Sequence, residues 1–247
     1  MRRREISSKA AADCDKYASL VAPRATEIVF HDAGDAAPSD IVSQLKDNPM
    51  MKLYWSPRSR SFSCIWLMEE TGRPYERVLT DIATGANKTP EFLAINPMGK
   101  VPALKDGDTT LAEAAAISAY VAERFPDAGL APLPGDRLRA KYLQWLFFAP
   151  SCIEPALIQL FTKIEVPAST AAWGSATQVF DVLDAALEKG PFLLGDRLSA
   201  ADIMVGSGLN FAVKVFNMVP ARPSFDRYIA ACSARPAFQR ASAIAAG

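Results

Sequence analysis

Two neighbouring stretches of the sequence carry groups that could bind a small, peptide-like ligand. The first is the run N-P-M-G-K-V-P-A-L at residues 96–104. Gly99 permits a tight turn in it, and Pro102 can only begin a strand because proline has no donor for a ladder hydrogen bond. If the Val101-Pro102 bond is cis, the amide and carbonyl of Val101 face solvent, where an extended ligand could pair with them as an added strand.

The second stretch begins a helix shortly after that strand. Glu113 and Ala114 precede an apolar pattern of Ile117, Val121 and Phe125 with the spacing of one helical turn, which predicts a helix that starts here. The first N–H groups of a helix have no intrahelical partner and lie at the positive end of its dipole, so this position suits a carboxylate. A β-hairpin followed by a core helix, with no ligand at all, explains the same spacing equally well.

Together the two stretches resemble the glutathione-binding signature of the glutathione S-transferase family. The matching runs read N-P-x-G-K-V-P-A-L and L-x-E-A-x-A-I-x-x-Y, and the likeness extends from residue 51 to about residue 243. The family is similar to thioredoxin in its first domain and all-helical in its second. The resemblance therefore implies an α/β thioredoxin-like domain that binds glutathione, followed by an all-helical domain.

The resemblance also assigns roles to residues of both stretches. In the family, the residue before a cis proline holds the cysteinyl backbone of glutathione, which carries over to Val101 and Pro102. Lys100, beside them, is included in the same predicted site. The acidic residue and small hydroxyl at the helix start hold the γ-glutamyl end, which carries over to Glu113 and Ala114. The family usually has serine at the second of these positions, so Ala114 keeps the backbone donor but loses the hydroxyl.

A serine-rich loop after the first predicted strand could supply a catalytic hydroxyl. It contains Ser56, Ser59, Ser61 and Ser63, together with Arg58 and Arg60. Turn formation and helix capping explain any single serine without catalysis. A glutathione enzyme must favour the thiolate of a thiol whose pKa is near 8.5, and a hydroxyl that donates a hydrogen bond to sulfur has this effect. Ser59 and Ser61 are therefore the catalytic candidates, with Ser59 slightly preferred.

A cysteine nucleophile is not predicted. Counted back from Gly72 and Pro74, Arg60 takes the position at which cysteine-bearing members of the family have their cysteine. Arg60 is instead assigned to glutathione binding. Cys64 lies further along the predicted helix, where packing in the core explains it better than catalysis does.

Composition narrows the partners and the compartment. Basic and acidic residues balance at 27 each, so no net field favours nucleic acid or an anionic membrane. No apolar run approaches the roughly 18 residues that cross a bilayer. The four cysteines are widely spaced and the one histidine, His31, lies outside the recognisable domain, so neither a disulfide framework nor a histidine-based metal site is predicted. A reducing, cytoplasmic location fits this pattern.

The order of the predicted elements explains how the candidate groups come together. Strands are predicted at residues 51–55 and 75–80, around a helix that begins in the serine loop and stops before Gly72. A short helix capped by Thr89 follows, and then a hairpin of strands at 102–105 and 109–111 joined by an Asp-Gly turn. The order βαβ, short α, ββ, α is that of a thioredoxin-like domain.

After residue 126 the β signals vanish and helical patterns take over, with a kink predicted at Pro155. Ser199 and Asp202 form a predicted capping box flanked by a hydrophobic staple, which is structural and not catalytic. We therefore predict a poorly ordered extension at residues 1–50, a glutathione-binding domain at 51–126, a linker at 127–136 and an all-helical domain at 137–247.

The leading interpretation is a glutathione transferase of the cytosolic type, in which the thiolate of bound glutathione attacks an apolar electrophile. Trp145, Phe147 and Phe148 could line the electrophile pocket, although aromatic residues at helical spacing are more often interior. A glutathione-dependent isomerase or ether-cleaving enzyme is a related alternative. A non-catalytic binding or assembly module is another, because this fold is reused as a scaffold. The resemblance also implies a homodimer that acts in detoxification, with glutathione as co-substrate and no metal.

Overall fold

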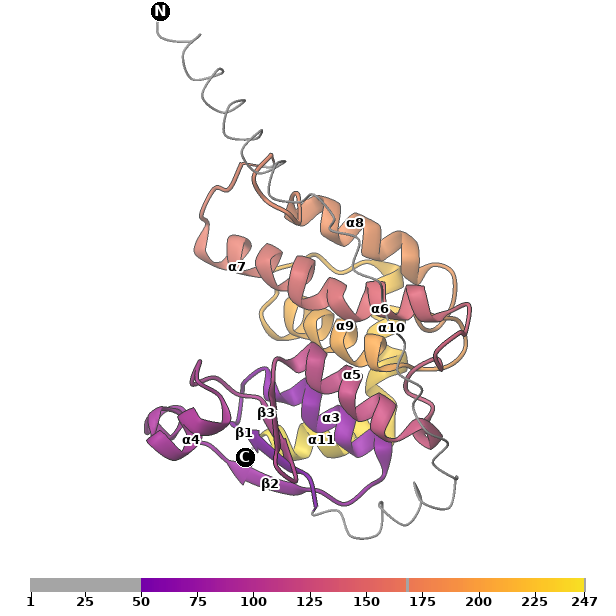
Figure 1. Ribbon diagram of the computed structural model, residues 1–247. Coiled ribbons are helices and arrows are strands. Elements are labelled where there is room, and N and C mark those ends of the chain that lie inside the picture. Colours follow the sequence, from indigo (N-terminus) through magenta and orange to yellow (C-terminus); the bar gives the residue numbers. More distant parts are fainter. Residues whose placement is uncertain (1–49, 168, 247) are drawn as a thin grey trace, which may run out of the picture. The chain divides into compact units, whose positions relative to one another are not determined.

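The computed structural model describes residues 50–167 and 169–246, and Figure 1 shows the order of their elements. Within this part of the chain, a four-stranded sheet with its helices is followed by a set of helices alone. This is the predicted combination of a thioredoxin-like domain and an all-helical domain. The predictions for residues 1–49, including the poorly ordered extension, lie outside the described residues, and the domain limits stay predictions.

Four short strands form the sheet in the order β2-β1-β3-β4. The strands are β1 (Lys52–Trp55), β2 (Glu76–Leu79), β3 (Ala103–Asp106) and β4 (Thr109–Ala112). β1 pairs in parallel with β2, and the other two pairs are antiparallel. The parallel pair is joined by α3 (Ser61–Thr71), which ends at Gly72 in the left-handed conformation, with a φ of 64°. The predicted order of strands and helices is therefore confirmed.

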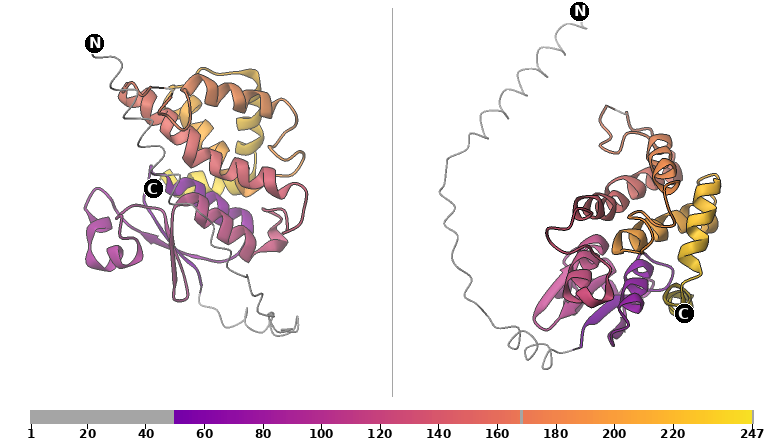
Figure 2. Two further views of the ribbon diagram at one scale, coloured as in Figure 1. Left: turned by 45° about the horizontal axis from the view of Figure 1, so that its top comes forward. Right: turned by 90° about the vertical axis from the view of Figure 1, so that its right-hand side faces the viewer.

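Helices cover both faces of the sheet, as the alternation of side chains along β1 requires. Leu53 faces α3 and is fully buried. On the opposite face, the ring of Tyr54 lies 5.8 Å from that of Phe92 in α4 (Pro90–Ile95). Thr89 caps α4 by accepting a hydrogen bond from the amide of Phe92, as predicted. Figure 2 shows α3 and α5 between the strands and the helices of the second half.

The second half of the described chain is helical. Its elements are α6 (Arg139–Phe148), α7 (Glu154–Thr162), α8 (Ala176–Leu187), α9 (Ala200–Asn210), α10 (Pro223–Ser233) and α11 (Pro236–Ala246), after α5 (Ala114–Arg124) of the first half. Two turns are π-helical, namely η3 (Ala149–Ile153) and η4 (Phe211–Val215). α9 is buried along almost its whole length and contacts α3, α5, α6 and α10. The predicted capping box at its start, between Ser199 and Asp202, is confirmed.

A π-helical turn lies just before Pro155, the residue at which a kink is predicted. The helical run from α6 to α7 is irregular at η3 and is a regular α-helix again from Glu154. A proline ring clashes with the carbonyl of the residue four positions earlier. Pro155 therefore removes the hydrogen bond to the carbonyl of Ser151, and Pro150, which lies inside η3, removes the one to Leu146.

The same run, Arg139–Thr162, is long and apolar enough to cross a membrane by those two criteria, whereas the search for apolar runs in the sequence found no candidate. The core helix of a soluble protein meets the same criteria. Here Tyr142, Leu146 and Ile153 are at most 1% exposed, and α6 packs against α9. One face of this run therefore packs in the helical half, while Phe147, Ile158 and Phe161 of the same run are at least 46% exposed.

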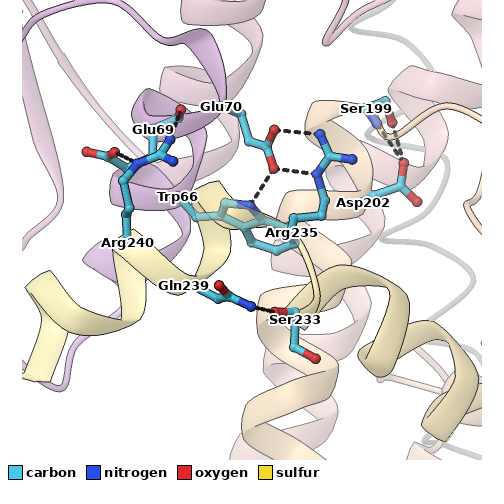
Figure 3. A network of polar contacts seen from close by, with 9 residues as sticks. All are labelled: Trp66, Glu69, Glu70, Ser199, Asp202, Ser233, Arg235, Gln239 and Arg240. Carbon is cyan, nitrogen blue, oxygen red and sulfur yellow. Dashed lines mark hydrogen bonds and ion pairs between the residues drawn. The ribbon is translucent and has the colours of Figure 1, made fainter.

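A polar network that the sequence did not predict fastens α11 to α3 (Figure 3). Glu70, whose side chain is 7% exposed, accepts hydrogen bonds of 2.6 and 2.7 Å from Arg235 and one of 2.9 Å from the indole of Trp66. Glu69 pairs with Arg240 of α11 at 2.6 Å. Two-point pairing between a guanidinium and a carboxylate fixes geometry as well as adding energy. The last helix of the chain is thus anchored to the helix that carries the serine loop.

Candidate functional site

Three loops meet at one end of the sheet because of its strand order. Tyr54 near the end of β1 lies opposite Ala103 at the start of β3, and Ala103 lies opposite Ala112 at the end of β4. The residues just beyond these positions are therefore neighbours. They are the serine loop after β1, the loop that leads into β3, and Glu113 after β4. The sheet thus brings together the three stretches that were selected from the sequence.

The loop before β3 presents an unpaired piece of backbone. The Val101-Pro102 bond is cis. Asn96 donates a hydrogen bond of 2.7 Å to the carbonyl of Lys100, which holds the preceding residue in place. Among the described residues, no hydrogen bond engages the amide or the carbonyl of Val101. An extended ligand can therefore pair with both groups.

A second cation beside this loop was not selected from the sequence. This cation is Lys88, whose Nζ lies against the turn at Gly99, where φ is 61°. A β-carbon added to Gly99 would come within 2.7 Å of that nitrogen. Asn87, from the same short turn η1 (Ala86–Lys88), donates a hydrogen bond of 2.7 Å to the carbonyl of Gly99. Lys88 and Lys100 are both exposed. Sequence spacing gave no sign of this, because Lys88 precedes α4 and meets the loop only after the chain has folded back.

α5 begins beside the same loop; Glu113, the residue before its first, has a strained backbone, and no side chain caps the helix. Glu113 has a φ of 67° and a ψ of 115°, a conformation that costs a residue other than glycine on the order of 1–3 kcal/mol and is concentrated at ligand sites. No side chain caps the helix, so the amides of Ala114 and Ala115 have no intrahelical acceptor. The positive end of the helix is therefore available to a carboxylate, as predicted from the sequence.

The two serine candidates differ in accessibility. Ser61 is 0% exposed, whereas Ser59 is partly exposed. The Oγ of Ser59 lies 2.7 Å from the carbonyl oxygen of Ser56 and 2.9 Å from the Oγ of Ser61, and it accepts a hydrogen bond of 3.2 Å from the amide of Ser61. The Ser59 hydroxyl thus lies at the first turn of α3, where rotation about one bond redirects its proton. This favours Ser59, although the catalytic role of either serine stays a prediction.

Arg60 contacts the helical half of the protein. Its Nε donates a hydrogen bond of 2.7 Å to Glu154 at the start of α7, and its Nη2 lies 2.6 Å from the same oxygen. The hydrogen bond to Glu154 raises the pKa of the guanidinium, which stays charged throughout the physiological range. The observed contact fastens the serine loop to α7, and the part of Arg60 in ligand binding stays a prediction.

Cys64 lies in the core, as predicted. Its thiol is fully buried, and burial raises its pKa to about 12, so the thiol is protonated at neutral pH. Its polar contact across to α5 is the carbonyl of Ala114, at 4.0 Å. In residues 50–167 and 169–246, no group of three or more His, Cys, Asp or Glu side chains is placed so that it could hold a metal ion.

The aromatic residues suggested for an apolar pocket, Trp145, Phe147 and Phe148, all lie on α6. Trp145 is 7% exposed and packs edge-on against Phe148, with 5.0 Å between ring centres, which is the interior position that helical spacing also allowed. A part of Trp145 in an electrophile pocket stays a prediction. Phe147 is exposed on α6. The first turn of α3 instead meets Glu154 through Arg60, and Phe211 through the ring of Phe62.

Sequence comparison finds one family along both halves of the described chain. The model of the glutathione S-transferase N-terminal domain matches residues 49–123, and that of the C-terminal domain matches residues 166–239. Glutathione S-transferase 3 of Zea mays is 34% identical over 205 residues, which are 77% of this chain and 92% of the relative. The probable glutathione S-transferase GSTF2 of Oryza sativa subsp. japonica is 32% identical over 209 residues, which are 78% and 96%.

Solved structures give the same result. A ternary complex of BphK, a bacterial GST, has a TM-score of 0.67 and 32% identity, covering 78% of this chain and 98% of the other. A sphingomonad glutathione S-transferase complexed with glutathione has a TM-score of 0.66 and 32% identity, with the same coverage of 78% and 98%. The similarity therefore covers most of this chain and nearly the whole length of these two structures.

Proposed function

This chain belongs to the glutathione S-transferase family and is a glutathione transferase, and we propose that it conjugates reduced glutathione to an apolar electrophile through a thiolate stabilised by Ser59. The observation that carries the proposal is the free amide and carbonyl of Val101 beside the uncapped start of α5. Together these groups match an extended peptide with a carboxylate at one end. We also propose that the protein is a cytoplasmic homodimer that acts in detoxification.

In the proposed pose, glutathione lies with its γ-glutamyl end at the start of α5 and its glycyl end toward Lys88 and Lys100. Its cysteinyl amide and carbonyl pair with Val101. Its γ-glutamyl carboxylate lies at the first amides of α5, from Ala114 onward, and its α-ammonium pairs with the carboxylate of Glu113. Its glycyl carboxylate lies toward Lys88 and Lys100, whose ammonium groups favour a negative charge. In this pose the sulfur points to the serine loop, because that loop adjoins the same end of the sheet.

The chemistry then requires only a proton shift and a substitution. The Ser59 hydroxyl donates a hydrogen bond to sulfur, which favours the thiolate and lowers the thiol pKa, and the proton leaves to water. The thiolate attacks the electrophilic carbon, a sulfur–carbon bond forms, and the leaving group departs with its electron pair. Cys64 takes no part, because its own thiol is buried and protonated.

Two measurements on the purified chain test this function together. They are retention on immobilised glutathione and glutathione-dependent conjugation of 1-chloro-2,4-dinitrobenzene. Retention with turnover supports the proposal. Retention without turnover indicates a non-catalytic module. The absence of a side-chain hydroxyl at Ala114 favours this alternative. Absence of retention contradicts the proposed binding groups.

Lys88→Ala is expected to raise the dissociation constant for glutathione about fivefold to tenfold, since a charge-assisted contact of this kind contributes about 1–1.4 kcal/mol. Titration calorimetry with glutathione measures the change. Lys189→Ala makes the same replacement at an exposed position after α8 and should leave the constant unchanged. If the two variants bind glutathione equally well, Lys88 is not part of the site.

Cys64→Ala is expected to keep glutathione-dependent turnover within about twofold of the wild type, because a thiol with a pKa of about 12 supplies no thiolate at neutral pH. The smaller side chain should lower the free energy of unfolding by on the order of 1 kcal/mol. Steady-state kinetics at pH 7 and urea denaturation measure the two effects. A loss of turnover of about a hundredfold without unfolding would make Cys64 a catalytic candidate.

A further inference from the structure

The strand β2 forms one edge of the sheet and is open on its outer side. In the described part of the chain it pairs with β1 alone (Figure 1). The amides of Glu76 and Thr80 donate hydrogen bonds of 2.8 and 2.7 Å to carbonyls on the β1 side. Because backbone groups alternate in direction along a strand, the amides and carbonyls of Arg77 and Leu79 point to the free edge. These groups can pair with an added strand.

The side chains at this edge combine a positive charge with an apolar group. Arg77 and Leu79 lie opposite Leu53 and Trp55 of β1, so both side chains are on the face of the sheet that carries α3. Arg77 is exposed, and Leu79 is 59% exposed. Among the described residues, no carboxylate forms an ion pair with Arg77. A segment with a carboxylate and an apolar side chain two positions apart would match both residues.

A hollow beside β2 adds two more guanidinium groups. It has a volume of about 780 Å³ and lies between the end of α3, the residues that lead into β2, and α11. Arg73, Arg77 and Arg240 line it, and of its described lining residues Glu69 alone carries a carboxylate. Glu69 pairs with Arg240 (Figure 3), and Asp127 pairs with Arg73. The lining therefore has an excess of positive charge, and Arg77 is the cation left to a ligand.

This edge is separate from the groups proposed to bind glutathione. The strand order places β2 on the side of β1 that faces away from β3 and β4. α3 starts at the serine loop and ends beside the hollow, and its 11 residues span about 16 Å. A segment bound to β2 therefore leaves Val101 and the start of α5 free.

Protection of the edge does not account for these features. One charged side chain is a common protection of an edge strand, and Arg77 alone would supply it. The exposed Leu79 beside it, and Ile82 just after the strand, which is 46% exposed, work against such protection. Two copies of this chain that met at β2 would bring both sets of arginines together, and like charges across a strand pair are unfavourable. The charge of the edge is matched by an acidic partner.

We propose that β2 is a docking edge for an extended, acidic segment of another protein, which adds a strand to the sheet. The segment places a carboxylate opposite Arg77 and an apolar side chain opposite Leu79. Its backbone pairs with the free amides and carbonyls of these two residues. The inference goes beyond the glutathione transferase function and does not depend on it.

A synthetic heptapeptide in which glutamate and valine alternate with threonine, in the order T-E-T-V-T-E-T, tests the inference. Its symmetry places glutamate two positions from valine in either strand direction. Fluorescence anisotropy of the labelled peptide measures binding to the full chain, and nuclear magnetic resonance follows the amides of Arg77 and Leu79. Arg77→Ala is expected to weaken binding about fivefold and to leave glutathione conjugation unchanged. Arg137→Ala removes an exposed arginine after α5 and is the matched control, expected to leave peptide binding unchanged.

Two altered peptides and one competitor separate strand pairing from attraction by charge. Lysine in place of both glutamates should abolish binding. N-methylation of the three central residues removes their backbone donors and should weaken binding about tenfold or more. Saturating S-hexylglutathione should leave the peptide bound, because it occupies a different part of the sheet.

Each contrary result overturns the proposal and leaves the glutathione transferase function standing. If the N-methylated peptide binds as well as its parent, the attraction is one of charge alone, as for a small organic anion, and no strand is added. The proposal also fails if the wild-type chain does not bind the peptide, if the amides of Arg77 and Leu79 do not shift, or if Arg77→Ala binds equally well. Displacement by S-hexylglutathione would place the peptide in the glutathione groove instead.

Discussion

Replacing Asp202 by alanine is expected to lower the free energy of unfolding by about 3–5 kcal/mol. The residue is 0% exposed, and its carboxylate accepts four hydrogen bonds of 2.8–3.0 Å. The donors are the amide and hydroxyl of Ser199, the amide of Leu193 and the hydroxyl of Tyr228 in α10. Alanine would take this acceptor from the amide and hydroxyl of Ser199 and from the part-buried amide of Leu193, whereas the hydroxyl of Tyr228 keeps the backbone carbonyl of residue 202 as a partner, at 3.3 Å. Each donor left unpaired in the core costs about 1–3 kcal/mol. The loss is large because a whole domain is stable by only about 5–15 kcal/mol.

Urea denaturation followed by circular dichroism measures this effect. Asp196→Ala makes the same replacement at an exposed position and should change the free energy of unfolding by less than about 0.5 kcal/mol. Ser199→Ala removes one donor and the helix cap and should cost about 1 kcal/mol. Should Asp202→Ala not fold, Asp202→Asn keeps the shape and one acceptor and gives a smaller, measurable loss. A loss below about 1 kcal/mol for the alanine variant would mean that this network does not hold α9 to α10.

Replacing Ser59 by alanine is expected to lower kcat/KM for glutathione conjugation about a hundredfold, which is the usual effect of removing one donor to a developing or stabilised anion. A donor to sulfur stabilises the charged form and lowers the thiol pKa, so its loss raises the pKa of the bound thiol toward its reference value near 8.5. The rate should therefore fall most at low pH and recover in part as the pH rises above that value. The pH dependence of kcat/KM measures the shift.

Ser61→Ala and Ser63→Ala are the matched controls in the same loop and helix. Both hydroxyls are buried, so neither replacement should move the pH profile, although each can lower stability. Because Ser59 also accepts a hydrogen bond from the amide of Ser61, the stability of Ser59→Ala has to be measured beside its kinetics. A shifted profile in Ser61→Ala would transfer the role to that residue, and an unshifted profile in all three would refute hydroxyl activation of sulfur.

The sequence by itself determined the local elements and the place of the ligand loop. Gly72 ends α3 because the left-handed conformation is easy only for glycine, and Thr89 caps α4 through its own hydroxyl. The capping box of Ser199 and Asp202 has the same local origin. Signals of this kind depend on residues within one or two turns of each other, so they can be read without knowing the fold. The turn at Gly99 and the uncapped start of α5 were found in the same way.

Only the tertiary structure decided which side chains distant in the sequence meet at the candidate site and around α3. Lys88 lies against the turn at Gly99, Glu154 reaches Arg60, and α11 is anchored on α3 through Glu70. These contacts join residues that are far apart in the chain, and they are set by the close packing of whole helices, to which many side chains contribute a little each. The two π-helical turns add a change of register that a regular helical period cannot describe. For the same reason helical spacing alone could not tell that Trp145 of α6 is buried while Phe147, two residues on, is exposed.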